Sequence, residues 1–359
     1  MKKFIETVVK NRWNLRFATV SFLFLAPLAL RAQQVQDQSI PPEQIEEELT
    51  QAEQQYQHAL ELFNPWYTGP LLTPSASMVP PGYALLQPYL FFTDNYGAFN
   101  EDRERVDAPN RFSISPQPVF LEIGITPSVD TSIFMGTIAS WQQGEFSGGF
   151  QDINIKLGFL INKQGLYAPQ AKFSIGQSFP TGAYNRLDPD NLGLDATGAG
   201  AWQTSFTLTI AKLILWNTLH PVNTRISFGY TVSTPIKVEN FNAYGGGYGT
   251  RGTVHPGNSF SADLGIEVSI NEPWVVALDM VYNCTNRTTF SGAPGTTTPR
   301  GPIPASVGSG FSDQLSFAPA IEYNFSDSMG LIGGFWFTVY GRNASNFISG
   351  IFSWYWVFP

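Results

Sequence analysis

The sequence predicts an all-β fold, an antiparallel transmembrane β-barrel of about 12 strands. Three observations predict it. Charged residues make up only 13% of the 359 residues, against roughly 25% in soluble proteins, while aromatic residues reach 14%. Apolar and polar residues alternate in many short segments, and the links between these segments are sorted into short and long ones. A barrel with an apolar outer face and a polar inner face also explains the near-neutral mean hydropathy.

Residues 1–32 are predicted to be a signal peptide. Lysines and arginines between Lys2 and Arg16 precede an apolar stretch that extends from Phe17 to Leu30. This order is typical of a secretory signal, and the stretch is too short for a spanning helix, which needs ~20 apolar residues. Cleavage after Ala32 gives an exported protein, and a retained membrane anchor is the alternative.

Residues 33–82 are predicted to form a periplasmic amphipathic helix followed by a Pro-rich connector. Between residues 42 and 63, apolar side chains recur at spacings of four and three, which indicates a helix with one apolar seam. The seam consists of Ile45, Leu49, Ala52, Tyr56, Ala59 and Phe63. Two roles stay open: the helix covers or closes the periplasmic mouth of the barrel, or it joins copies of the chain into a homo-oligomer.

Residues 83–359 are predicted to be the barrel itself. In the clearest segment, 260–270, the even-numbered residues are apolar and the odd-numbered ones are polar or glycine. A period of two is the pattern of a half-buried strand. Comparable alternation, in part fainter, covers 83–93, 112–125, 130–141, 152–159, 168–178, 203–214, 225–232, 260–270, 273–284, 314–323, 330–340 and 347–358.

The lengths of the connections favour a membrane barrel over a soluble sandwich. Even-numbered strands are followed by short links, at 126–129, 162–166, 271–272 and 326–328, and by a longer one at 216–223. Odd-numbered strands are followed mostly by long polar or Gly-rich links, at 94–111, 179–202, 236–259 and 285–312, with shorter ones at 142–149 and 341–346. Outer-membrane barrels have short periplasmic turns and long outer loops, whereas a sandwich has no reason to sort its loops in this way.

Strand parity also predicts which charged residues point into the lumen. In a membrane barrel the apolar face meets lipid and the polar face points inward. The candidates that face the lumen are Glu122, Asp152, Lys156, Lys172, Arg225, Asp263, Glu267, Asp279 and Glu322. Charges inside a barrel are costly unless they are paired or hydrated. These residues therefore indicate either a wet pore with a transverse field or ion pairs that fill a narrow lumen.

The chain ends on an aromatic strand, SGIFSWYWVFP. With a period of two, Phe352, Trp354, Trp356 and Phe358 share one face, which we expect to meet lipid near the membrane interface. Outer-membrane barrels resemble one another in ending on an aromatic residue that is read during assembly. These four residues are therefore the predicted signal for the outer-membrane assembly machinery, and Pro359 departs from that pattern.

One loop carries a resemblance to a known family. Residues 179–184 read Phe-Pro-Thr-Gly-Ala-Tyr, and Asn191-Leu-Gly193 and the segment 198–202, which ends at Trp202, follow before the next strand. This "P-T-G-x-Y … N-x-G … W" passage of about 25 residues resembles the MetA-pathway phenol-degradation family. The resemblance implies an outer-membrane barrel associated with uptake of aromatic or other small organic compounds. The helix predicted at 42–63 is not expected from the family.

The sequence offers little for catalysis or metal binding. A net charge of −8 argues against a nucleic-acid partner, and the single Cys284 excludes an internal disulfide framework. His255 and Ser259 are the nearest approach to a hydrolytic pair, but they lack the spacing of outer-membrane phospholipases. The acidic loop residues weighed as a Ca²⁺ site are Asp188, Asp190 and Asp195, for which a solvated loop is the simpler interpretation. No catalytic residue, metal or cofactor is predicted.

These expectations favour a channel in the outer membrane of a Gram-negative-type bacterium, in contact with the lipid bilayer. It would pass small organic solutes passively, including aromatic or hydrophobic ones. The alternative is a structural or adhesive surface barrel whose Gly-, Tyr- and Thr-rich loops bind an external partner. An enzyme is a distant third hypothesis, since no nucleophile with a positioned base is found.

Overall fold

The computed structural model describes residues 41–62, 66–214 and 218–359. The predicted signal peptide, 1–32, lies outside these ranges. The chain divides into two compact units, Met1–Tyr56 and Gln57–Pro359, and each is described by itself. In the first unit and its border lies the helix α3 (Pro42–Leu62), at the position that the apolar spacing predicts. Its Ile45 and Leu49 are exposed, so oligomerisation through this helix stays a prediction.

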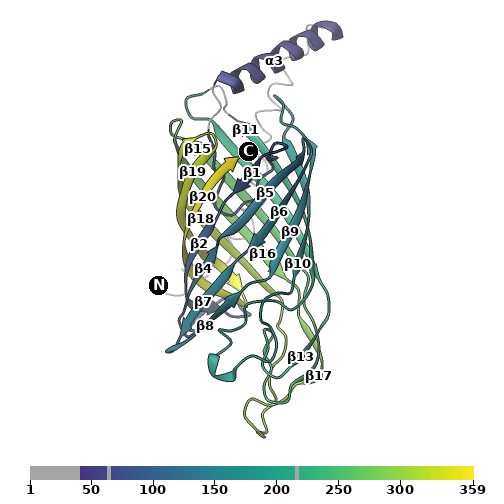
Figure 1. The fold of residues 1–359 in the computed structure, drawn as a ribbon, viewed down its shortest axis with the longest axis vertical. Coiled ribbons are helices and arrows are strands. Elements are labelled where there is room, and N and C mark those ends of the chain that lie inside the picture. Colours follow the sequence, from purple (N-terminus) through teal and green to yellow (C-terminus); the bar gives the residue numbers. More distant parts are fainter. Residues whose placement is uncertain (1–40, 63–65, 215–217) are drawn as a thin grey trace, which may run out of the picture. The chain divides into compact units, whose positions relative to one another are not determined.

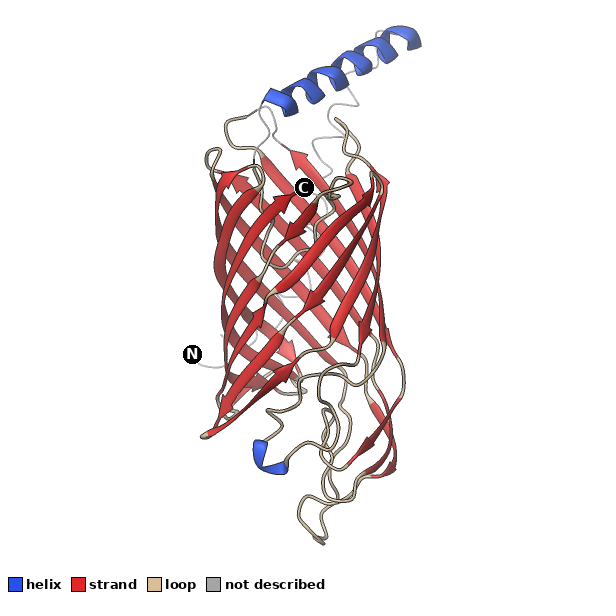
Figure 2. Cartoon of the chain, viewed as in Figure 1, coloured by secondary structure: helices blue, strands red, loops and turns tan. Residues whose placement is uncertain are grey.

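The second unit is a closed barrel of twelve antiparallel strands, as predicted (Figures 1 and 2). Its elements are β1 (Ala84–Leu86), β2 (Tyr89–Phe99), β4 (Arg111–Gln117), β5 (Val119–Thr126), β6 (Val129–Met135), β7 (Thr137–Gln142), β8 (Glu145–Phe150), β9 (Ile153–Asn162), β10 (Gln170–Phe179), β11 (Gln203–Ile214), β12 (Val222–Ser233), β15 (Ser259–Ser269), β16 (Trp274–Thr285), β18 (Ser312–Ser326), β19 (Met329–Arg342) and β20 (Ala344–Phe358). The barrel closes where β20 pairs with β1 and β2, with Ala84 opposite Phe358 and Tyr89 opposite Ser353.

The first four wall strands are each interrupted once, so β1–β2, β4–β5, β6–β7 and β8–β9 count as one wall strand apiece. The interruptions lie at Pro88, Pro118, Gly136 and residues 151–152. Proline lacks the N–H that a sheet ladder needs, which explains the first two. Across Pro118 the inward parity changes, because Ser115 is buried before it and Glu122 after it. The interruption therefore decides which residues of this wall strand reach the lumen.

The two ends of the barrel differ in their connections. Short turns such as 326–329 form one end, which we call the short-turn end, and the other is the long-loop end. The long loops are themselves folded. They contain β3 (Arg105–Val106), the 3₁₀ helix η1 (Pro189–Asn191) and a three-stranded sheet of β13 (Ile236–Glu239), β14 (Arg251–His255) and β17 (Thr289–Ala293).

The outer surface of the wall is apolar. Outward residues such as Leu157, Phe228 and Leu278 are each about two-fifths exposed, while their strand neighbours point inward. The described part of the chain has no helix that combines the length and the apolar character needed to span a bilayer. The alternation that predicted half-buried strands thus separates an apolar exterior from a polar interior.

Candidate functional site

A segment of the chain lies inside the barrel. Residues 66–82, which we call the lumen segment, belong to the range 33–82 that was expected to be a periplasmic helix and Pro-rich connector. The structure instead brings them into contact with inward side chains of the wall in the short-turn half. The Pro- and Gly-rich composition that suggested a linker also suits an extended chain inside the barrel.

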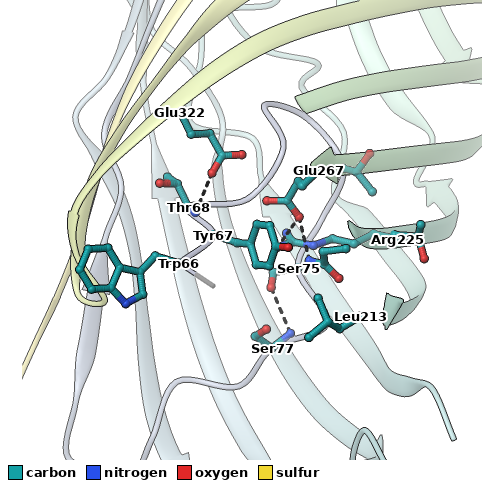
Figure 3. Close-up of polar contacts among 12 residues, drawn as sticks. Trp66, Tyr67, Thr68, Ser75, Ser77, Leu213, Arg225, Glu267 and Glu322 are labelled. Carbon is teal, nitrogen blue, oxygen red and sulfur yellow. Dashed lines mark hydrogen bonds and ion pairs between the residues drawn. The ribbon is translucent and has the colours of Figure 1, made fainter. Parts of the chain in front are cut away.

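Two buried carboxylates hold the first part of the lumen segment. Thr68 N–H donates to Glu322 Oε2 at 2.9 Å (Figure 3), and Thr68 Oγ1 lies 2.7 Å from Asn324 Oδ1. Asp279 accepts from Leu72 N–H at 3.3 Å, and its Oδ1 accepts from the N–H and hydroxyl of Thr73 at 2.9 and 2.5 Å. These bonds satisfy backbone donors that an extended segment leaves free, and a charged acceptor makes each of them stronger.

The opposite wall holds the later part of the lumen segment through donors. Gln170 Nε2 donates to Ala76 O at 2.8 Å, and Lys172 Nζ donates to Ser77 O at 3.2 Å. Lys172 Nζ also pairs with Glu122 at 2.9 Å and with Asp130 at 2.5 Å. The lumen segment is therefore held between acceptors on β16 and β18 and donors on β10.

A separate ion pair, between Arg225 and Glu267, lies beside Tyr67. Arg225 Nη2 is 3.1 Å from Glu267 Oε2, and Asn223 Nδ2 donates to the same oxygen at 2.8 Å (Figure 3). Glu267 and Glu322 are fully buried, and each keeps its Oε1 without a hydrogen-bond partner among the described residues. Lys172 and Arg225 in this half are thus both paired with acids.

Two wall glycines make room for the lumen segment. A Cβ on Gly265 would lie 2.7 Å from Pro70 Cγ, and a Cβ on Gly334 would lie 2.7 Å from Leu71 Cδ1. Such distances are closer than packed atoms tolerate, so Gly265 leaves space for Pro70, while at Gly334 the nearest atom is the wall's own Pro319 O at 2.3 Å. The wall is shaped to receive this segment.

A cavity of about 610 Å³ remains between the lumen segment and one side of the wall. Tyr89, Phe91, Phe120 and Phe134 supply aromatic rings to its lining, and Lys156 is among its polar residues. Its volume is within the range of small-molecule pockets, roughly 300–1,000 Å³. The lumen segment reduces the lumen without filling it.

Lys156 differs from the other lumen cations of the wall. Among the described residues, no hydrogen bond or ion pair within 4.0 Å involves its Nζ, although Glu122, Lys172 and Asp263 exert electrostatic influence on it. Asp263, inward on β15, likewise has no ion-pair partner in the described part of the chain. Lys156 on β9 and Asp263 on β15 are thus a cation and an anion without ion-pair partners among the described residues, and the wet-pore interpretation stays a prediction.

Asp152 does not lie within a strand, unlike the other lumen candidates. It occupies the interruption between β8 and β9, where its carboxylate accepts from Gly182 N–H at 2.9 Å and Ala199 N–H at 2.8 Å. Thr181 Oγ1 donates to Gln151 O at 3.0 Å beside it. The P-T-G-x-Y passage therefore serves to dock its loop onto the wall at this interruption.

A second cavity, of about 680 Å³, lies under the long loops. Arg111, Phe134, Asp152 and Tyr244 line it, together with loop backbone around Thr197. The Arg111 guanidinium has only a long hydrogen bond of 3.4 Å, to Ser140, and no acidic partner among the described residues.

Burial raises the pKa of the Tyr244 phenol to about 12, so it stays neutral at physiological pH, and its hydroxyl donates to Ala199 O at 2.7 Å.

Other candidate residues from the sequence are not brought into a site. Asp188 accepts from Asp190 N–H and Asp195 accepts from Asp188 N–H, so these acids stabilise the loop around η1. No cluster of potential metal ligands occurs in the described ranges. His255 pairs with Thr289 across β14 and β17, within the small loop sheet.

The terminal aromatic residues lie where parity predicts. Phe352, Trp354 and Trp356 are 62%, 50% and 46% exposed on the outer face. Phe358 is half-buried, and its ring centroid lies 4.7 Å from that of Trp356. Their role as an assembly signal stays a prediction.

The chain resembles solved outer-membrane barrels in structure. The COG4313 outer membrane channel from Pseudomonas putida F1 matches with a TM-score of 0.57 and 11% identity, over 79% of this chain and 98% of that chain. The NanC porin matches with a TM-score of 0.37 and 8% identity, over 76% and 98%. A deletion mutant of the monoaromatic hydrocarbon channel TodX matches with a TM-score of 0.33 and 10% identity, over 77% and 91%.

No protein-family model and no curated protein matches the sequence itself. The resemblance of the P-T-G-x-Y passage to the MetA-pathway family therefore stays a prediction. At 11% identity, the likeness to the P. putida channel concerns the fold alone. This chain has the fold of an outer-membrane channel barrel.

Proposed function

We propose that this chain is an outer-membrane channel for passive passage of small organic solutes, and that its lumen segment restricts the pore at rest. One observation carries the proposal. A closed wall, apolar outside and polar inside, surrounds cavities and a segment held by side-chain and backbone hydrogen bonds. An apolar exterior favours lipid, and a polar interior with room for solutes favours transport over a purely structural barrel.

The same proposal orients the barrel. The short-turn end faces the periplasm and the long-loop end faces the outside, as in bacterial outer-membrane barrels. The terminal aromatic residues serve assembly, and the chain performs no covalent chemistry. Passage of aromatic solutes, which the MetA-pathway resemblance implies, is supported by the aromatic lining of the cavity beside the lumen segment. The sequence of events is solute uptake under the long loops, movement past Phe134, and displacement of the lumen segment.

Single-channel recording in planar bilayers tests this function. The full chain is compared with a variant in which residues 66–80 are replaced by a Gly-Ser linker of equal length. We expect low conductance for the full chain and a clearly higher one for the variant, since the linker lacks the contacts that hold the segment. Altered mobility of the unheated protein on gels verifies that the variant barrel is folded. A folded variant without conductance or solute flux would overturn the proposal.

A further inference from the structure

Two cations without acidic partners, Arg111 and Lys156, lie on the proposed solute path, whereas most acids that line this path have partners. Arg111 lines the cavity under the long loops, and Lys156 lines the cavity beside the lumen segment. Neither forms an ion pair with an acid among the described residues, whereas Lys172 has two such pairs and Arg225 has one. The unpaired side chains Arg111 and Lys156 therefore give this path a local positive charge.

The acids that line these cavities are largely neutralised. Glu122 and Asp130 pair with Lys172. Asp152 accepts two backbone hydrogen bonds from Gly182 and Ala199. Asp327, at the turn between β18 and β19, lines the cavity beside the lumen segment and has no ion pair among the described residues. The chain as a whole carries a net charge of −8, so the cationic character of this path is local.

Phe134 connects the two cations. It is the residue that lines both cavities, between Arg111 in one and Lys156 in the other. The cavity beside the lumen segment adds the rings of Tyr89, Phe91 and Phe120. Aromatic rings favour the flat apolar body of a solute, and a cation with no partner favours an anionic group on it, because pairing offsets the cost of a desolvated charge.

We propose that this path binds small aromatic carboxylates, with Arg111 receiving the carboxylate at the long-loop cavity and Lys156 binding it beside the aromatic wall. The inference rests on the proposed channel function and names its substrate class. Asp263 faces the lumen but lines neither cavity. A volume of about 610 Å³ accommodates a single aromatic ring with its carboxylate.

Equilibrium binding to the full chain in detergent micelles tests the inference without requiring passage. The probes are benzoate, phenol and benzylamine, which share a ring and differ in charge. We expect benzoate to bind more tightly than phenol, and benzylamine to bind most weakly. Lys156→Gln should weaken benzoate binding about tenfold, the loss of one charge-assisted hydrogen bond, and should leave phenol binding unchanged.

Matched variants separate charge at the site from charge elsewhere. Lys156→Arg keeps the charge and should keep benzoate binding. Lys237→Gln removes one exposed lysine from β13 in the outer loops and should have no effect. Asp263→Asn should leave benzoate binding equal or tighter. Equal affinity for benzoate and phenol, or equal benzoate binding by the native chain and Lys156→Gln, would overturn the inference.

Flux measurements distinguish the two proposals. In vesicles containing the variant without the lumen segment, failure of every probe to cross would overturn the channel function while leaving benzoate binding intact. Free passage of phenol and benzylamine at the rate of benzoate would support a channel and contradict its selectivity for anions. The anion-to-cation permeability ratio in a KCl gradient should exceed one and fall when Arg111→Gln and Lys156→Gln are combined.

Discussion

Two regions of the lumen differ in whether their lysines form ion pairs with acids. In the short-turn half, Lys172 contacts Glu122, Asp130 and the lumen segment, and its side chain is only 7% exposed. Towards the middle of the barrel, on the neighbouring strand β9, Lys156 has no acidic partner within ion-pair distance among the described residues. The difference indicates that the first lysine holds structure together and the second is free for a solute.

Replacing each lysine by methionine tests that comparison most strongly. Lys172→Met leaves two buried acids unpaired, so we expect the free energy of unfolding to fall by about 3–5 kcal/mol. Lys156→Met removes no pair and should change it by no more than about 0.5 kcal/mol. Urea unfolding of the barrel from lipid vesicles measures both. Equal destabilisation by the two variants would remove the distinction between the halves.

A charge on the outer wall tests the surface that encloses both halves. Ile226 lies outward on β12, exposed on the apolar face. Ile226→Lys should destabilise the barrel by about 2–4 kcal/mol, because lipid does not solvate an ammonium group. The control is Ile303→Lys in an outer loop, where the native side chain is 62% exposed and water solvates the new charge. Similar losses for both variants would contradict a lipid-facing wall.

The hydrogen bonds of Asp279 test how firmly the lumen segment is held. Asp279→Asn exchanges charge-assisted acceptance from Leu72 and Thr73 for weaker neutral bonds, a loss of about 1.5 kcal/mol. The ratio of open to closed channels should rise about tenfold, measured as open probability in planar bilayers. Asp313→Asn is the control, since Asp313 pairs with Arg103 at the long-loop end. An equal rise in open probability in both variants would indicate that the whole barrel is loosened and that the lumen segment is not specifically released.

The smallest effect concerns the end of the chain. Deleting Pro359 leaves Phe358 as the terminal residue, and we expect a modestly higher yield of assembled barrel in the membrane. Phe358→Ala should lower that yield, because it removes the aromatic residue predicted to be read during assembly. Gel mobility of unheated membranes measures the assembled fraction. A lower yield after deletion of Pro359 would show that the terminal proline contributes to assembly.

Sequence reasoning succeeded where a single physical constraint applies along the whole chain. Every wall strand separates lipid from a polar interior, so a period of two in residues such as 260–270 is sufficient to predict a strand. The sorting of short and long links predicted the two ends of the barrel for the same reason. Strand parity also predicted that Lys172 and Glu122 both face the lumen.

The lumen segment could not be predicted in this way. Residues 66–82 have no periodicity, and their Pro and Gly content fits a linker as well as an extended chain inside a barrel. The signals that indicate its place lie elsewhere, in wall glycines such as Gly265 and Gly334 and in inward acids such as Asp279. None of them has meaning until the wall is closed and the distances across it are known.

By itself, the sequence determined the barrel, its strand number and which face is apolar, because these follow from local alternation, and the lengths of the links determined its two kinds of end. Only the tertiary structure decided which inward charges pair, that Asp152 docks a loop, and that the lumen holds a segment of its own chain. Pairing depends on distances between strands far apart in sequence. Lys156 and Lys172 look alike in the sequence, and acids on the nearby strands β5 and β6 form ion pairs with Lys172 alone.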